Sequence, residues 1–117
     1  MAERVGTGWR TSWRVLNEDP IAVRVIEAVA PHSQFRGETP LDLEVRAGEA
    51  ATFALVVHAD GAPGSEIENA FVILLIQQSD ERWRILARLR VPLDGTARPQ
   101  PRIETITTQR VGFSGEL

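Results

Sequence analysis

Apolar and polar residues alternate along most of the chain, and a period of two predicts β-strands rather than helices. The longest apolar run, in residues 69–77 (NAFVILLIQ), holds six consecutive apolar residues and is short, β-branched and aromatic. Pro63-Gly64 lie upstream and Ser79-Asp80 downstream, so we interpret the run as a strand covered on both faces. The next segment, 83–91, largely alternates apolar residues with Arg, and the two segments predict a central hairpin.

Five further segments carry a strand pattern, and turns rich in Gly, Pro, Asn and Asp separate them. They are 9–16, 21–29, 41–46, 51–57 and 102–108, and in the last of these we expect Ile103 and Ile106 to face opposite ways. Glu27 interrupts the apolar face of its segment, so we expect the strand either to bend there or to have its inner face near an edge. Residues 31–40 (PHSQFRGETP) are expected to be the longest irregular stretch between strong elements. A helix over 44–58 is an alternative, which Gly48 and the β-branched residues near its end disfavour.

These seven segments predict a single all-β domain over residues 1–117, with a loose lead-in at 1–8 and a C-terminal tail at 109–117. A chain of 117 residues can bury a core without disulfide or metal staples. Of the three tryptophans, Trp9 is the one that we expect to be exposed. The predicted core contains Trp13, Val23, Val25, Phe53, Leu55, Phe71, Ile73, Leu75, Trp83, Ile85 and Leu89.

Three pieces of the sequence resemble the small bacterial immunoglobulin-like domains. Residues 13–25 (WRVLNEDPIAVRV) look like their opening strand, Asn-led turn and next strand, 43–53 (LEVRAGEAATF) look like their short strand, Gly-Glu turn and following strand, and 63–65 (PGS) look like the Pro-Gly approach to their penultimate strand. The resemblance implies an immunoglobulin-like antiparallel β-sandwich of about seven strands, of Greek-key type, with a tendency toward binding roles. It carries over no active-site residue.

Composition narrows the function classes. The chain has no Cys, which excludes disulfides, thiol catalysis and Cys-based zinc sites. Its net charge of −3 argues against a chain whose partner is nucleic acid or anionic lipid. The first residues lack the apolar core of a secretory signal, and no apolar run approaches the ~20 residues that span a bilayer. We therefore expect a soluble, cytoplasmic protein with no membrane partner.

The most chemically varied stretch is His32-Ser33-Gln34-Phe35-Arg36. A His could serve as base to a nearby Ser, and His32 and His58 could bind a metal together with Asp60, Glu66 or Glu68. However, adjacent residues on an extended chain point apart, and neither a third catalytic group nor the ligand spacing of a known metal site is present. The interpretation that we favour is a turn in which Phe35 plugs the end of the sandwich. We therefore expect no catalytic residue, no metal and no cofactor.

Arg82, Arg84, Arg88 and Arg90 lie on one face of a single predicted strand. Such a ladder could hold phosphate, nucleic acid or an acidic partner. Alternatively it is a solvated face whose guanidinium groups pair with carboxylates on neighbouring strands. The excess of acidic residues and the lack of accompanying aromatic side chains favour the second interpretation.

The tail, with Gln109, Arg110 and Phe113, is polar and carries two apolar anchors and two glycines. It could add an edge strand to a neighbouring chain or fold back on its own domain. Our leading hypothesis is a non-catalytic binding or assembly module that acts through residues 31–40 and this tail. Its partner would be another protein or a second copy, in a homodimer formed by edge-strand or tail exchange. The alternatives are a small hydrolase or metal-dependent enzyme centred on His32, and an anion or nucleic-acid binder that uses the arginine ladder.

Overall fold

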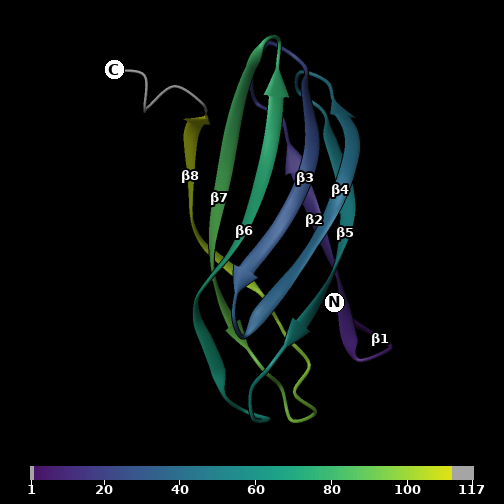
Figure 1. Ribbon diagram of the computed structural model, residues 1–117, viewed down its shortest axis with the longest axis vertical. Coiled ribbons are helices and arrows are strands. Elements are labelled where there is room, and N and C mark those ends of the chain that lie inside the picture. Colours follow the sequence, from purple (N-terminus) through teal and green to yellow (C-terminus); the bar gives the residue numbers. More distant parts are fainter. Residues whose placement is uncertain (1, 112–117) are drawn as a thin grey trace.

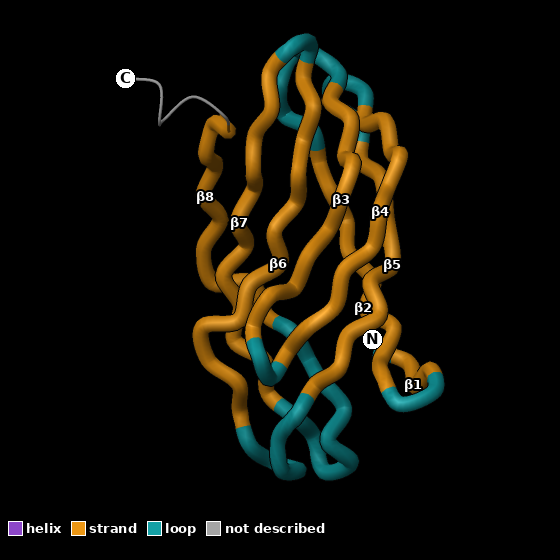
Figure 2. The backbone as a smooth tube through the Cα atoms, viewed as in Figure 1, coloured by secondary structure: helices purple, strands orange, loops and turns teal. Residues whose placement is uncertain are grey.

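The computed structural model describes residues 2–111, which form eight β-strands and no helix (Figure 1 and Figure 2). All neighbouring strands are antiparallel, in the order β1-β2-β5-β4-β3-β6-β7-β8. The predicted all-β class is confirmed. The count exceeds the expected seven because the presumed lead-in contains a short strand paired with β2. The strands are β1 (Glu3–Val5), β2 (Gly8–Leu16), β3 (Val23–His32), β4 (Phe35–Val45), β5 (Ala50–Ala59), β6 (Glu66–Gln78), β7 (Glu81–Pro92) and β8 (Arg102–Val111).

The sheet folds over on itself where β4 meets β5. These two strands pair only at Phe35–Ala59 and Arg36–His58 and then separate. From there β5 continues beside β2, whereas β4 continues beside β3. In the view of Figure 1, β2 and β5 therefore pass behind β3 and β4. Side chains from both halves form one core, whose largest fully buried members are Phe35, Leu55, Leu89, Val25, Val45, Val57, Val91 and Pro99.

The central hairpin of β6 and β7 is confirmed, but the inward face of β6 is the opposite of the predicted one. Phe71, Ile73 and Leu75 face outward, and the core instead contains Ala70, Val72, Leu74 and Ile76. Alternation could not decide this, because both faces of the run are apolar. Pairing decides it, since Ile76 lies opposite Trp83, while Leu74 lies opposite Ile85. The folded-over half covers only the inner face, so the expectation that both faces are covered is wrong.

The other predicted core residues fall on the expected face. Val25, Phe53, Leu55 and Leu89 are buried, and Trp13, Val23, Trp83 and Ile85 are partly buried against the core. The bend expected at Glu27 is confirmed as a shift in the pairing register of β3.

Trp9 is not exposed, contrary to expectation, and retains only 6% of its accessible surface. The guanidinium groups of Arg4 and Arg98 lie 5.0 and 5.7 Å from the centre of its ring. Attraction between a cation and the face of an indole, together with the cover that two Arg stems provide, explains this burial.

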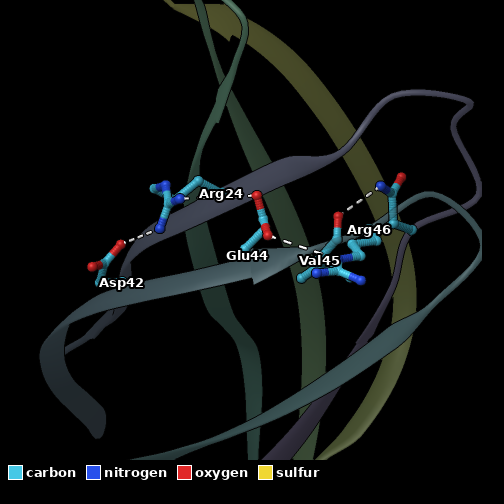
Figure 3. Close-up of polar contacts among 6 residues, drawn as sticks. Arg24, Asp42, Glu44, Val45 and Arg46 are labelled. Carbon is cyan, nitrogen blue, oxygen red and sulfur yellow. Dashed lines mark hydrogen bonds and ion pairs between the residues drawn. The ribbon is translucent and has the colours of Figure 1, made fainter.

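The buried Asn17 joins the end of β2 to the turn between β4 and β5. As predicted for a turn at 17–20, its Oδ1 accepts a hydrogen bond from the backbone N–H of Asp19, at 3.0 Å. Its Nδ2 donates to the carbonyl oxygens of Ile21 and Val45, at 2.9 and 3.0 Å. Figure 3 shows the bond to Val45 beside the ion pairs of Arg24 on the outer face of the sheet.

Residues 31–40 are not irregular, which corrects the prediction. β3 continues to His32, Ser33-Gln34 form a two-residue turn, and Phe35 begins β4. Pro31 and Pro40 lack an N–H, but each lies where its strand has only one paired neighbour. Pro31 follows the last pair between β3 and β6, and Pro40 follows the last pair between β4 and β5. Proline is tolerated at such edge positions.

Gly37 stands where β4 crosses β5, and it is the basis of a first prediction. A Cβ at Gly37 would overlap the carbonyl oxygen of Val56, whereas a Cβ at Gly95 would meet nothing within 4 Å. We expect Gly37→Ala to lower the free energy of unfolding by about 1–3 kcal/mol, because backbone must move to relieve the overlap. Gly95→Ala is the matched control and should change it by less than about 1 kcal/mol. Urea unfolding measures both variants, and equal stability would contradict the close crossing.

Candidate functional site

The two ends of the sheet present free backbone edges. One edge of β2 pairs with β5, and on its other edge β1 covers only residues 8–10. Within the described part of the chain, residues 11–16 of β2 have no strand on that side. β8 is the last strand in the order, so among residues 2–111 nothing pairs with its outer edge either.

These two free edges cannot pair antiparallel with each other. Six consecutive antiparallel pairings lead from β2 through β5, β4, β3, β6 and β7 to β8. An even number of reversals leaves β2 and β8 running in the same direction. A strand placed between them in the opposite direction would be antiparallel to both, as in the rest of the sheet.

A groove runs along β2 on this open side of the fold, and we call it the β2–β8 groove. It consists of three adjoining hollows of about 330, 220 and 330 Å³, which share Trp13 or Val15 as common walls. We call the hollow that reaches Ala2 and residues 99–102 the lower end of the groove. The hollow that reaches residues 17–19 is its upper end. The middle hollow is the most apolar in its lining, which includes Trp13, Val15, Phe53, Val72, Leu74, Ile85, Ala87, Ile103 and Ile106.

Two exposed isoleucines of β8 form one side of the middle hollow. Ile103 is 51% exposed and Ile106 is 61% exposed. They face the same way, not opposite ways as predicted, because a bulge adds Glu104 to β8. Ile103 therefore lies opposite the inward-facing Leu89, and Ile106 lies opposite Ala87. The bulge gives the groove two large apolar side chains that nothing in the described chain covers.

The wall of the groove on β2 is held by hydrogen bonds. The indole Nε1 of Trp13 donates to Oγ1 of Thr11 at 2.8 Å, and that buried hydroxyl donates to the carbonyl oxygen of Leu55 at 2.8 Å. Trp83, which lines the upper hollow, has a buried indole Nε1 with no acceptor among the described residues. A buried donor without an acceptor is uncommon and costs free energy.

Charge differs between the two ends of the groove. Glu18 and Asp19 lie at the upper end and are exposed. Arg110, also near this end, is paired with Glu81 and lies over the ring of Trp83, 6.0 Å from its centre. Arg102 lies at the lower end. The upper end is therefore acidic and the lower end basic.

The lower end of the groove is shaped by the connection between β7 and β8, which Asp94 organises. Its Oδ1 accepts hydrogen bonds from the N–H and the hydroxyl of Thr96, both at 2.8 Å, and from the N–H of Arg98 at 2.9 Å. These bonds to Thr96 and Arg98 stabilise the carboxylate and lower the pKa of Asp94 below its ordinary value of 3.8.

His32 and its neighbours do not form a catalytic arrangement in the described structure. Nδ1 of His32 accepts a hydrogen bond from the N–H of Gln34 at 3.0 Å, so this nitrogen is occupied within the turn. Phe35 is fully buried, as the favoured interpretation predicted. Arg36 pairs with Asp60 at 2.7 Å and donates to the carbonyl oxygen of Ser33 at 2.9 Å. In residues 2–111, no group of three or more His, Asp or Glu side chains is placed to hold a metal.

Three of the four ladder arginines have partners. Arg82 donates to Gln77 at 3.1 Å, Arg88 pairs with Glu104 at 3.6 Å, and Arg90 lies 3.4 Å from both Glu66 and Glu104. These contacts favour the interpretation of a solvated, paired face. Arg84 is the ladder residue for which the described chain provides no partner. Of the predicted tail residues, Gln109 and Arg110 belong to β8, and Phe113 lies outside the described residues.

No protein-family model, curated protein or solved structure matches the chain. Within residues 2–111, no helix has the length and apolar character needed to cross a bilayer.

The lining residues on β2 and β8 were not among the predicted site residues. Trp13 was assigned to a closed core, and Ile106 was assigned to the face opposite Ile103. One signal in the sequence was available: β8 is rich in Thr yet carries two isoleucines near its start. Two isolated large apolar residues in an otherwise polar edge strand are typical of a surface that contacts another segment.

Asp94 gives a prediction on pH. Because its pKa is lower in the folded chain than in the unfolded one, its contribution to stability is present above pH 3.8 and is lost as the pH falls through the folded pKa. Thermal unfolding of the wild type should therefore move to lower temperature on acidification below about pH 4. Asp94→Asn should show a smaller decrease over this range. Asp80→Asn, which removes a carboxylate of the β6–β7 turn, is the control and should follow the wild type. A wild-type slope in Asp94→Asn would contradict the assignment.

Proposed function

We propose that this chain is a non-catalytic binding module that accepts an extended segment of another protein chain in the β2–β8 groove. The observation that carries the proposal is the free edge of β2 beside the uncovered apolar residues of the middle hollow, such as Ile103 and Ile106. β-strand addition uses these two features, because backbone hydrogen bonds supply affinity and alternate side-chain pockets supply specificity. The proposal keeps the expected binding or assembly role. It moves the contact surface away from residues 31–40, because Phe35 is buried and Arg36 is paired.

β1 supports this proposal because it already occupies the C-terminal end of such a strand, opposite residues 8–10 of β2. Glu3 lies opposite Arg10 in the antiparallel pair, so Ala2 lies beside Thr11, and Ala2 retains only 4% of its accessible surface. An incoming segment continues the line of β1 on the N-terminal side of Ala2 and meets the backbone groups of residues 12–16. In that register, its residues opposite Trp13 and Val15 point into the groove, over Ile85 and Ile106. The required pattern is two apolar residues separated by one residue.

Charge complementarity predicts which end of an antiparallel segment is basic and which is acidic. A strand antiparallel to β2 begins near Glu18 and Asp19 and ends near Arg102. The favoured segment therefore has a basic residue before its apolar pair and an acidic residue after it. A backbone carbonyl at its upper end is the acceptor that Nε1 of Trp83 lacks in the described chain.

The proposal also includes a specific fold within the all-β class. We take the folded-over sheet to be an open relative of the immunoglobulin-like sandwich, with the connections of a Greek key. Two facts support this: the resemblance of residues 13–25 and 43–53 to those domains, and the position of β2 and β5 across the core from β3 and β6. The bound segment would cover the inner face of β7 and β8, which β2 and β5 leave exposed.

The proposal predicts that the chain binds a capped peptide, Lys-Ser-Val-Thr-Val-Ser-Glu, labelled for fluorescence polarisation. The reversed peptide, Glu-Ser-Val-Thr-Val-Ser-Lys, has the same composition and apolar spacing but opposite charge direction. Because its charges would meet like charges at both ends, we expect at least about tenfold weaker binding, or about 1.4 kcal/mol. Equal affinity for the two peptides would contradict the assigned direction.

A pair of β8 variants tests the location of the peptide. Ile106→Arg places a charge on the floor of the groove and should abolish binding, since burying an unpaired charge is costly. Thr105→Arg introduces the same side chain on the opposite face of the same strand and should bind the peptide normally. Both parent residues are exposed, so both variants should fold, as circular dichroism checks. Normal binding by Ile106→Arg would exclude the groove as the site.

A further inference from the structure

The outer face of the five-stranded half carries a second surface that the proposed function does not use. This face, turned toward the viewer in Figure 1, is polar along β4 and β8. Its centre is apolar, and we call the five outward side chains there the outer patch: Val29, Phe71, Ile73, Leu75 and Leu86. Four of them, all but Phe71, line a depression of about 360 Å³ together with Glu27, Arg84 and Gln109.

This patch departs from the usual pattern of an antiparallel layer, in which the solvent-facing side chains are polar. In β6, the strand with the longest apolar run, both faces are apolar, yet the described chain covers only one of them. Contiguous apolar surface of this kind is typical of an interaction site.

The patch is bounded by one acidic and one basic side chain. Glu27 on β3 and Arg84 on β7 both lie level with Leu75 of β6, one strand away on either side. Neighbouring strands are about 4.8 Å apart, so their backbones are separated by roughly 10 Å. Neither side chain has an ion pair or hydrogen bond within residues 2–111. Two opposite, unpaired charges therefore flank an apolar surface symmetrically about β6.

We infer that the outer patch is a homodimer interface whose occupant is the same patch of a second copy. A two-fold axis along β6 places β3 of each copy over β7 of the other. Glu27 of each copy then meets Arg84 of the other, and the apolar side chains between them are covered. The two ion pairs are reciprocal, so a single surface is complementary to itself. Glu27 and Arg84 carry opposite charges, so this pair adds no net charge to the interface.

The test is sedimentation equilibrium of the purified chain and five variants, over a range of concentrations. Glu27→Arg and Arg84→Glu each place like charges opposite each other twice per dimer, and each should weaken dimerisation at least about tenfold. The double variant restores opposite charges with their positions exchanged and should recover the wild-type dimerisation constant. Arg14→Glu, a matched charge reversal on β2 outside the patch, should leave the constant unchanged.

The outcomes separate this inference from the proposed groove. Loss of the dimer in both single variants and recovery in the double variant supports the reciprocal contact. A wild-type monomer at all concentrations would overturn it, as would a dimer that is insensitive to Arg84→Glu or a double variant that stays monomeric. Ile106→Arg should dimerise normally. If this substitution abolished the dimer, the contact between copies would lie at the β2–β8 groove and not at the outer patch. Failure of peptide binding leaves the dimer interface standing, because the two surfaces share no residue.

Discussion

The direction of the strands is the constraint on which the rest of the structure depends. With every neighbouring pair antiparallel, β2 and β8 run in the same direction and cannot close the sheet against each other in that pattern. The chain is left with two backbone edges and an apolar floor between them. Closing the gap in the same pattern needs one more antiparallel strand, and β1 supplies only the last three residues of it. The open groove is thus a consequence of topology rather than of a local defect in packing.

The close crossing of β4 over β5 determines which surfaces remain exposed. Because Gly37 lets the two backbones approach, β5 and β2 swing across the core and cover β3 and β6. Their half has only three strands, one of them very short, while the opposite half has five. The inner face of β8 therefore extends beyond its cover, and Ile103 and Ile106 remain open. The outer face of β6 is left bare for a different reason, since no element in the described chain passes over it.

Local patterns in the sequence predicted the local structure well. Alternation identified β2 and β5 with the correct inward faces, and Asn17 identified the turn between β2 and β3. Alternation fails where it carries no information, as in the six apolar residues of β6, where only pairing with β7 chooses the face. It also fails at bulges: one extra residue, Glu104, turned Ile106 to the side that the period of two had excluded. The groove and the outer patch both follow from these two failures. They depend on pairings between segments distant in the sequence, which no local pattern contains.

The central claim is that an extended segment pairs with the free edge of β2, and nuclear magnetic resonance of the complex tests it most directly. The account predicts Hα–Hα contacts between the bound peptide and residues 12–16, in the order of an antiparallel pair that continues β1. It also predicts methyl contacts from the two valines of the peptide to Ile85 and Ile106. Contacts in a parallel order, contacts to the outer face of β6, or no contacts to β2 would contradict the account.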